Sequence, residues 1–331
     1  MTIHWVTFLL SATAIILAGI RLAPYGEAIG RRTGIGQGWI GLLFLATLTS
    51  IPEMTTTVTG ALIDVPNIAL GNAFGSNLFN VVIIAVLDVL LLGRGPFLLK
   101  VRSYHVLSGS VAVVLTLLAA LGIAIGSTTT WLGISPFSWL ILIGYIAGVF
   151  LLYHAEKKQV ELEEETGEPM SLSKAILGFA LCAVVVIVSG IFLIGSSKAI
   201  SLATGLSASF MGAFLVAIVT SLPELATSIG ALRIGAYDMI VGNLFGSNMF
   251  NILTIFFADS AFRSGSILSG LGVVGEKDQL VVAICGVLLT VIAMIAISVR
   301  SRRKVLGVGI DSMVLWVVYL MATVLIISRG I

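Results

Sequence analysis

One sequence pattern occurs twice in this chain, and the repetition constrains the fold more than any other feature. The first copy reads Thr-Ser-Ile-Pro-Glu at 49–53 and Gly-Asn-Ala-Phe-Gly-Ser-Asn-Leu-Phe-Asn at 71–80. The second copy follows 171 residues later without a gap, as Thr-Ser-Leu-Pro-Glu at 220–224 and Gly-Asn-Leu-Phe-Gly-Ser-Asn-Met-Phe-Asn at 242–251. A match of this length indicates an internal duplication. We therefore expect two halves with the same arrangement of elements.

The composition places both halves in a membrane. Hydrophobic residues make up 58% of the 331 and charged residues only 10%, with a mean hydropathy of +1.13, whereas soluble domains carry about 25% charged residues. Apolar runs of about 20 residues predict membrane spans. Ten such runs lie at 3–22, 37–61, 67–91, 104–125, 131–153, 173–195, 207–231, 239–258, 278–299 and 308–328. The expected fold is an all-α integral membrane protein of ten transmembrane helices, with a first five-helix repeat at 1–153, a short cytoplasmic linker at 154–172 and a second repeat at 173–331.

The distribution of Lys and Arg predicts the orientation. The loops after the odd-numbered spans carry all of these residues except Lys198, Arg263, Lys277 and Arg329. Positively charged loops stay in the cytoplasm, so both termini are expected outside, in a multi-pass protein of the cell membrane. Because each half has an odd number of spans, the second half enters the membrane upside down. Secondary transporters often use such inverted repeats, with the binding site at the midplane, and nothing suggests nucleic-acid binding.

Each copy of the pattern places a proline and a glutamate inside a span. Pro52 and Pro223 have no N–H to donate, so they break helices 2 and 7 and leave nearby carbonyl oxygens without helical partners. Glu53 and Glu224 follow directly, and an ionisable group at this depth is a functional-site hypothesis by default. Four hydroxyl groups lie within one turn, those of Thr49, Ser50, Thr220 and Ser221.

The second part of each copy adds amides and hydroxyls on one helix face. Asn72, Ser76 and Asn80 are spaced by four residues and share a face, as do their counterparts Asn243, Ser247 and Asn251. Pairs of glycines four residues apart, at 71 and 75 and at 242 and 246, predict that another helix backbone approaches closely. Oxygen ligands without His or Cys suit hard cations such as Ca²⁺ and Na⁺. These ions are expected as substrates, and no cofactor is expected.

At these residues the chain resembles the sodium/calcium exchanger branch of the calcium/cation antiporter superfamily, whose signature alpha repeats are similar to 46–80 and 217–251. The resemblance implies a central Ca²⁺ site formed by Glu53, Glu224 and the carbonyls of Thr49 and Thr220. It also implies flanking Na⁺ sites at Ser50, Ser76, Ser221, Ser247 and the carbonyls of Ala46 and Ala217. Asn80 is expected to line the site. Asn251, at the matching position of the second repeat, stands where many of these exchangers carry Asp, so the site is expected to have two carboxylates.

The resulting hypothesis is a Na⁺/Ca²⁺ antiporter that works by alternating access and is not an enzyme. Ca²⁺/H⁺ exchange, K⁺-dependent Ca²⁺ exchange and a cation channel remain alternatives. The sequence leaves open the ion stoichiometry and the oligomeric state. It also leaves open whether the repeated acids Asp88 and Asp259 are interfacial caps or line an acidic vestibule.

Overall fold

The computed structural model describes residues 2–91, 96–160, 170–204, 219–305 and 307–328, and this part of the chain is almost wholly helical. The long helices are α1 (Thr2–Thr33), α4 (Ile51–Leu62), α5 (Pro66–Leu90), α6 (His105–Ile125), α7 (Pro136–Val160), α8 (Leu172–Thr204), α10 (Leu222–Ile234), α11 (Tyr237–Ala261), α12 (Gly272–Val299) and α13 (Ile310–Ser328). Shorter elements are α2 (Gln37–Trp39), the π-helix η1 (Ile40–Leu45), α3 (Ala46–Thr49), the 3₁₀ helix η2 (Phe97–Lys100) and the antiparallel strands β1 (Lys304–Val305) and β2 (Val308–Gly309).

These helices confirm an all-α membrane protein. Within the described residues, seven helices are long and apolar enough to cross a membrane, and two shorter apolar helices span Gln37–Thr49 and Ile310–Ile326. The first part of the predicted span 207–231 lies outside the described residues. Helix α7 continues to Val160, seven residues beyond the predicted end of its span.

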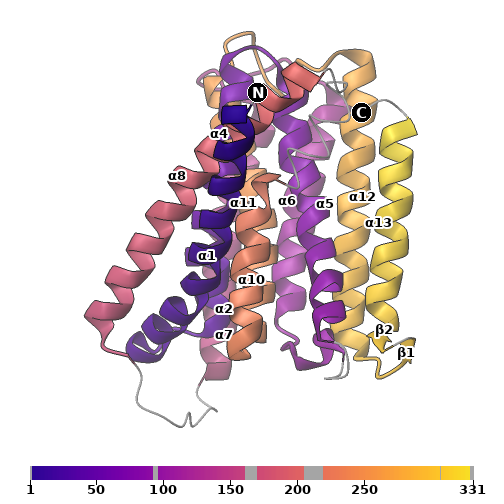
Figure 1. The fold of residues 1–331 in the computed structure, drawn as a ribbon. Helices are drawn as coiled ribbons and strands as arrows, with labels where there is room; N and C mark the ends of the chain where they lie inside the picture. The colour runs from indigo at the N-terminus through magenta and orange to yellow at the C-terminus, as the bar shows by residue number, and fades with distance from the viewer. Residues whose placement is uncertain (1, 92–95, 161–169, 205–218, 306, 329–331) are drawn as a thin grey trace.

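The helices of predicted spans 1 and 6 continue beyond the predicted ends of the spans. Helices α1 and α8 have 32 and 33 residues, or about 48 Å at 1.5 Å per residue, whereas the hydrocarbon core of a bilayer is about 30 Å thick. Arg21 therefore lies within α1 and not in a loop, and Pro24 does not end this helix. Helices of this length can extend beyond the hydrocarbon region, and α8 slants across one side of the bundle (Figure 1).

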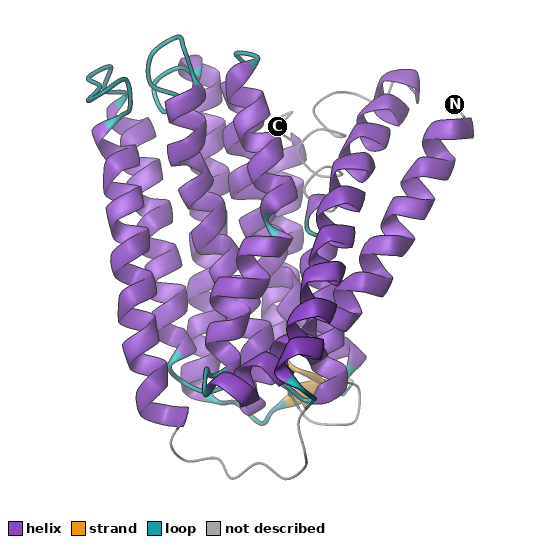
Figure 2. Cartoon of the chain, turned by 90° about the vertical axis from the view of Figure 1, so that its left-hand side faces the viewer, coloured by secondary structure: helices purple, strands orange, loops and turns teal. Residues whose placement is uncertain are grey.

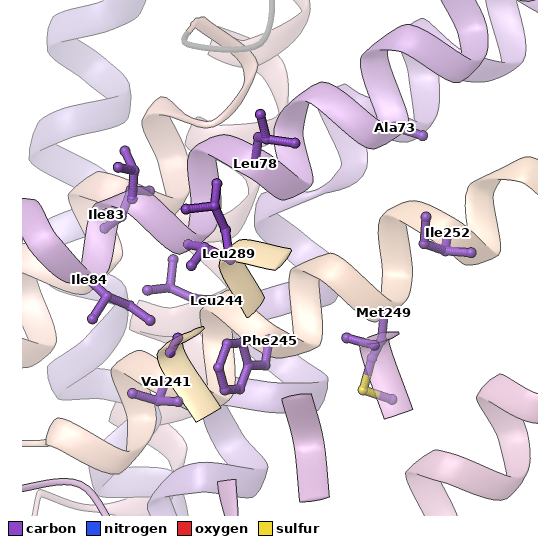
Figure 3. Close-up of a cluster of buried hydrophobic side chains, with 14 of the residues drawn as sticks. Ala73, Leu78, Ile83, Ile84, Val241, Leu244, Phe245, Met249, Ile252 and Leu289 are labelled. Atoms are coloured by element: carbon purple, nitrogen blue, oxygen red, sulfur yellow. The ribbon is translucent and has the colours of Figure 1, made fainter. Parts of the chain in front are cut away.

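Helices α5 and α11 form the centre of the bundle. In their apolar stretches 72% and 89% of the residues are buried, so other helices surround them on nearly every side. Figure 3 shows the apolar cluster that fixes them, including Leu78 of α5, Leu244 and Phe245 of α11, and Leu289 of α12. The polar residues of the duplicated pattern lie on the same two helices and are buried as well.

The two short helices that follow the breaks lie in different parts of the bundle. Helix α4 lies in the part of the bundle near the two termini, whereas α10 lies in the opposite part (Figure 1). The start of α1 and the end of α13 lie at the same end, and β1 and β2 lie at the other end (Figures 1 and 2).

The repeated acids Asp88 and Asp259 are buried caps, and their carboxylates do not face a vestibule. Asp88 accepts hydrogen bonds from the backbone N–H groups of Phe97 (2.6 Å) and Gly309 (2.7 Å). Asp259 accepts from the N–H groups of Ile267 and Ser135 and from the hydroxyl of Ser138, each at 2.7 Å. Each acid thereby joins the loop after its own helix to the start of the last helix of the other half.

Candidate ion-binding site

Two single-residue breaks form the framework of the site. Helix α3 ends at Thr49 and α4 begins at Ile51, and the residue between them, Ser50, has φ −90° and ψ 8°. Ser221 precedes α10 with nearly the same values, φ −87° and ψ 9°. A proline follows in the first turn of α4 and of α10. The glutamates are then also in the first turn, where the helix dipole favours negative charge.

Each glutamate reaches the break of the opposite half. The Ser50 hydroxyl donates to Oε1 of Glu224 at 3.0 Å, and the Ser221 hydroxyl donates to Oε1 of Glu53 at 3.3 Å. Ser247 of α11 also donates to Oε1 of Glu224, at 3.3 Å. Both glutamates are fully buried. The structure therefore brings the two predicted carboxylates together at the centre of the bundle.

The threonines before the breaks contact serines of the central helices. The Thr49 hydroxyl lies 3.5 Å from that of Ser247 and donates to Oδ1 of Asn243 at 3.4 Å. In the other half, the Thr220 hydroxyl lies 3.4 Å from that of Ser76. Each threonine thus meets the central helix of the opposite half, and all these side chains are buried.

Asn72 and Asn243 hold the short helices against the central ones. The Asn72 amide donates to the carbonyl of Glu53 and to the hydroxyl of Thr57, each at 3.0 Å. The Asn243 amide donates to the hydroxyl of Thr227 at 2.9 Å. These bonds position the glutamate-bearing helices α4 and α10.

Sequence reasoning missed two residues beside the site, Asn77 and Asn248. The Asn80 amide donates to Oδ1 of Asn248, and the Asn251 amide donates to Oδ1 of Asn77, each at 3.1 Å. Both missed residues repeat with the motif, which is the signal that could have found them. They lie off the helix face defined by the four-residue spacing.

Buried oxygen atoms without donors remain at four predicted ligands. Within the described residues, Oε2 of each glutamate and Oδ1 of Asn80 and Asn251 have no hydrogen-bond partner. These atoms can only accept, unless a carboxyl is protonated, and a buried charge needs compensation. In the described part of the chain, no group of three or more His, Cys, Asp or Glu is placed so that it could hold a metal ion. Carboxylate, amide and hydroxyl oxygens of this kind can coordinate hard cations such as Ca²⁺ and Na⁺.

The backbone ligands predicted from the resemblance are only partly described. The Ala46 carbonyl accepts a hydrogen bond from the Ser50 N–H at 3.1 Å and also lies within 3.5 Å of the Thr49 hydroxyl. Ala217 lies outside the described residues. The side chains of Ser50, Ser76, Ser221 and Ser247 are all fully buried.

The predicted close backbone contact occurs at the second glycine pair. A Cβ at Gly246 would collide with the carbonyl oxygen of Leu42, and one at Gly242 with that of Gly38. At Gly71, by contrast, an added Cβ would meet the side chain of Gln279 at an ordinary 3.5 Å.

Gly246→Ala should therefore destabilise the protein by about 2 kcal/mol, because overpacking against a helix backbone costs about 1–3 kcal/mol. Gly71→Ala is the matched control and should change the stability by less than about 1 kcal/mol. Thermal unfolding of both variants in detergent measures the difference. Equal melting temperatures for the two variants would contradict the close contact.

Comparison with known proteins agrees with this arrangement. The family model "Sodium/calcium exchanger protein" matches residues 3–154 and 174–325. The inner membrane protein YrbG of Escherichia coli is 27% identical over 282 residues, covering 78% of this chain and 82% of YrbG. The sodium/calcium exchanger MaX1 of Methanosarcina acetivorans is 24% identical and covers 90% of each chain.

Solved structures have the same fold. A structure of the sodium-calcium exchanger NCX_Mj, soaked with Na⁺ and Ca²⁺, aligns with a TM-score of 0.72 and 20% sequence identity. The alignment covers 97% of this chain and 98% of that one. Since the family model matches both halves of the chain, this protein is a membrane transporter, not an enzyme, and it belongs to the sodium/calcium exchanger family.

Proposed function

We propose that this protein exchanges Na⁺ for Ca²⁺ across the cell membrane by alternating access. The observation that carries the proposal is the pair of buried glutamates, each hydrogen-bonded across the bundle through one oxygen while the other oxygen has no donor among the described residues. Two carboxylates neutralise one Ca²⁺, and the same oxygens can hold Na⁺ instead. Competition for shared oxygens couples the two fluxes.

The proposed architecture is ten transmembrane helices in two inverted five-helix repeats, 1–153 and 173–331, joined by a linker at 154–172. The opposite positions of α4 and α10 support the inversion, as do paired contacts that recur after a shift of 171 residues. Both termini are proposed to lie outside the cell, because the other end of the bundle carries most of the Lys and Arg.

The proposed ligands divide between two ions. Ca²⁺ is bound by Glu53 and Glu224, with the carbonyls of Thr49 and Thr220 and the amide oxygens of Asn80 and Asn251. Na⁺ is bound in flanking positions by Ser50, Ser76, Ser221, Ser247 and the carbonyls of Ala46 and Ala217. Buried hydroxyls close to both carboxylates support this division.

The moving elements are proposed to be α1 and α8, which pack on the site through glycines. A Cβ at Gly19 of α1 would lie 2.7 Å from Cβ of Ala226 on α10, and a Cβ at Gly190 of α8 would lie 2.7 Å from Cγ of Pro52 on α4. Because glycine has no side chain, a contact of this kind lets two helices pack closely and slide over one another. Each long helix thus covers the broken helix of the opposite half.

Uptake of ⁴⁵Ca²⁺ into proteoliposomes tests the proposal. Vesicles loaded with Na⁺ and diluted into Na⁺-free medium should accumulate Ca²⁺, and vesicles with equal Na⁺ on both sides should not. Uptake driven by a pH gradient without Na⁺ would instead assign Ca²⁺/H⁺ exchange, and a requirement for K⁺ would assign K⁺-dependent exchange. Ca²⁺ currents without countertransport would indicate a channel.

A further inference from the structure

Two asparagines next to the site contact each other across the α5–α11 interface. The Asn77 amide donates to the backbone carbonyl of Asn248 at 3.2 Å, and the Asn248 amide donates to that of Asn77 at 3.4 Å. Because each NH₂ group is engaged in this way, each side-chain oxygen is left to accept a hydrogen bond from elsewhere. Oδ1 of Asn77 accepts a hydrogen bond from the NH₂ group of Asn251, and Oδ1 of Asn248 accepts one from the NH₂ group of Asn80.

These hydrogen bonds determine which end of the Asn80 and Asn251 side-chain amides remains available to an ion. The oxygen and the NH₂ group of an asparagine have nearly the same size, so only hydrogen bonding distinguishes their orientations. In Asn80 and Asn251 the NH₂ groups are bound, and the oxygens have no donor among the described residues. An amide turned the other way would present N–H groups to a bound cation and repel it.

We propose that Asn77 and Asn248 are positioning residues that hold the amides of Asn251 and Asn80 with their oxygens toward the ion. The inference rests on the proposed function of the same site. It assigns a crossed pairing: Asn77 of the first half orients Asn251 of the second, and Asn248 of the second half orients Asn80 of the first. Neither residue needs to touch the ion.

Packing alone does not account for these residues. Asn77 and Asn248 are each at most 5% exposed, and both line a cavity of about 10 Å³ together with Ala112, Thr116, Ala283 and Thr290 of α6 and α12. Apolar side chains would fill such a position with less desolvation cost. A reciprocal pair of buried amides is needed only if their polar atoms form hydrogen bonds that the site requires.

The first test is Asn77→Leu, which keeps a side chain branched at Cγ but removes the acceptor for Asn251. Removing the outer partner of a metal ligand typically weakens binding roughly 10–100-fold, so the Kd for ⁴⁵Ca²⁺ should rise by at least about tenfold. Size-exclusion profiles and melting temperatures show whether the variant is folded, and Asn77→Ala replaces it where leucine prevents folding.

A second-site substitution separates orientation from packing. An aspartate at position 251 has an oxygen at both ends, so it has no wrong orientation to adopt. In the Asn77→Leu background, Asn251→Asp should bring the Kd within about threefold of the Asn251→Asp single variant, which is a difference of about 0.6 kcal/mol. A defect of packing would persist in the double variant.

The crossed pairing supplies the control. Asn251→Asp should not correct Asn248→Leu, whereas Asn80→Asp should correct Asn248→Leu but not Asn77→Leu. Correction of both leucine variants by either aspartate would reveal a general effect of added charge and overturn the proposal, as would no correction at all. Ca²⁺ binding without Na⁺-driven uptake would refute the proposed antiport yet leave this comparison intact, and a wild-type protein that binds no Ca²⁺ would refute both.

Discussion

Glu224→Gln should abolish Na⁺-driven Ca²⁺ uptake while the protein remains folded. Glutamine keeps Oε1, which accepts hydrogen bonds from Ser50 and Ser247, so these contacts survive. The second oxygen, which has no donor in the described part of the chain, becomes an NH₂ group facing the bound ion. Removing one partner of a buried charge pair costs about 2–5 kcal/mol, so uptake should fall by at least about 30-fold. Glu53→Gln should have the same effect, because its carboxylate is held by Ser221 in the corresponding way.

Stability distinguishes this loss from misfolding. Without Ca²⁺ the glutamine variants should melt at or above the wild-type temperature, because a buried charge without a partner opposes folding. Added Ca²⁺ should raise the melting temperature of the wild type but not of the variants. The control is Glu276→Gln near the start of α12, which removes the same charge outside the site and should leave uptake unchanged. Uptake above about a tenth of the wild-type rate in Glu53→Gln and Glu224→Gln would contradict a site built on two carboxylates.

The sequence predicted the chemistry of the site better than the extent of the helices. Pro52 and Glu53 are informative alone, because a proline and a charge inside an apolar run have few physical explanations. Helix α1, in contrast, continues past Arg21 and Pro24, since a long helix can leave the hydrocarbon region and stay helical by packing on α8 and α10. Hydropathy reports the apolar stretch and not the tilt.

Other features depend on tertiary contacts that no local pattern contains. The π-helix at Ile40–Leu45 lies against α11, where the Gly41 backbone approaches Met239. Asn77 lies off the face that spacing by four residues selects, and its partner is 171 residues away in the chain. The duplication does mark it, since a motif position that repeats needs an explanation even when helical periodicity offers none.

Asp259→Ala should cause the largest loss of stability of any change considered. Its carboxylate accepts three hydrogen bonds of 2.7 Å, two from backbone N–H groups and one from Ser138, in a fully buried position. Hydrogen bonds to charged groups contribute about 1.5–3 kcal/mol each, and buried donors left without a partner cost about 1–3 kcal/mol. The free energy of unfolding should therefore fall by roughly 4 kcal/mol or more.

The counterpart Asp88 makes two such bonds, both with backbone N–H groups, so Asp88→Ala should cost less than Asp259→Ala. The control is Asp64→Asn in the turn between α4 and α5. Asp64 is exposed and has φ 61°, a conformation that asparagine tolerates well, so the melting temperature should not change. Thermal unfolding in detergent ranks the three variants. If Asp259→Ala had the same melting temperature as Asp64→Asn, the carboxylate would not be joining α11 to α7, and the two halves would be connected at this end by other contacts, such as the hydrogen bond from Gln279 to the Asn67 carbonyl.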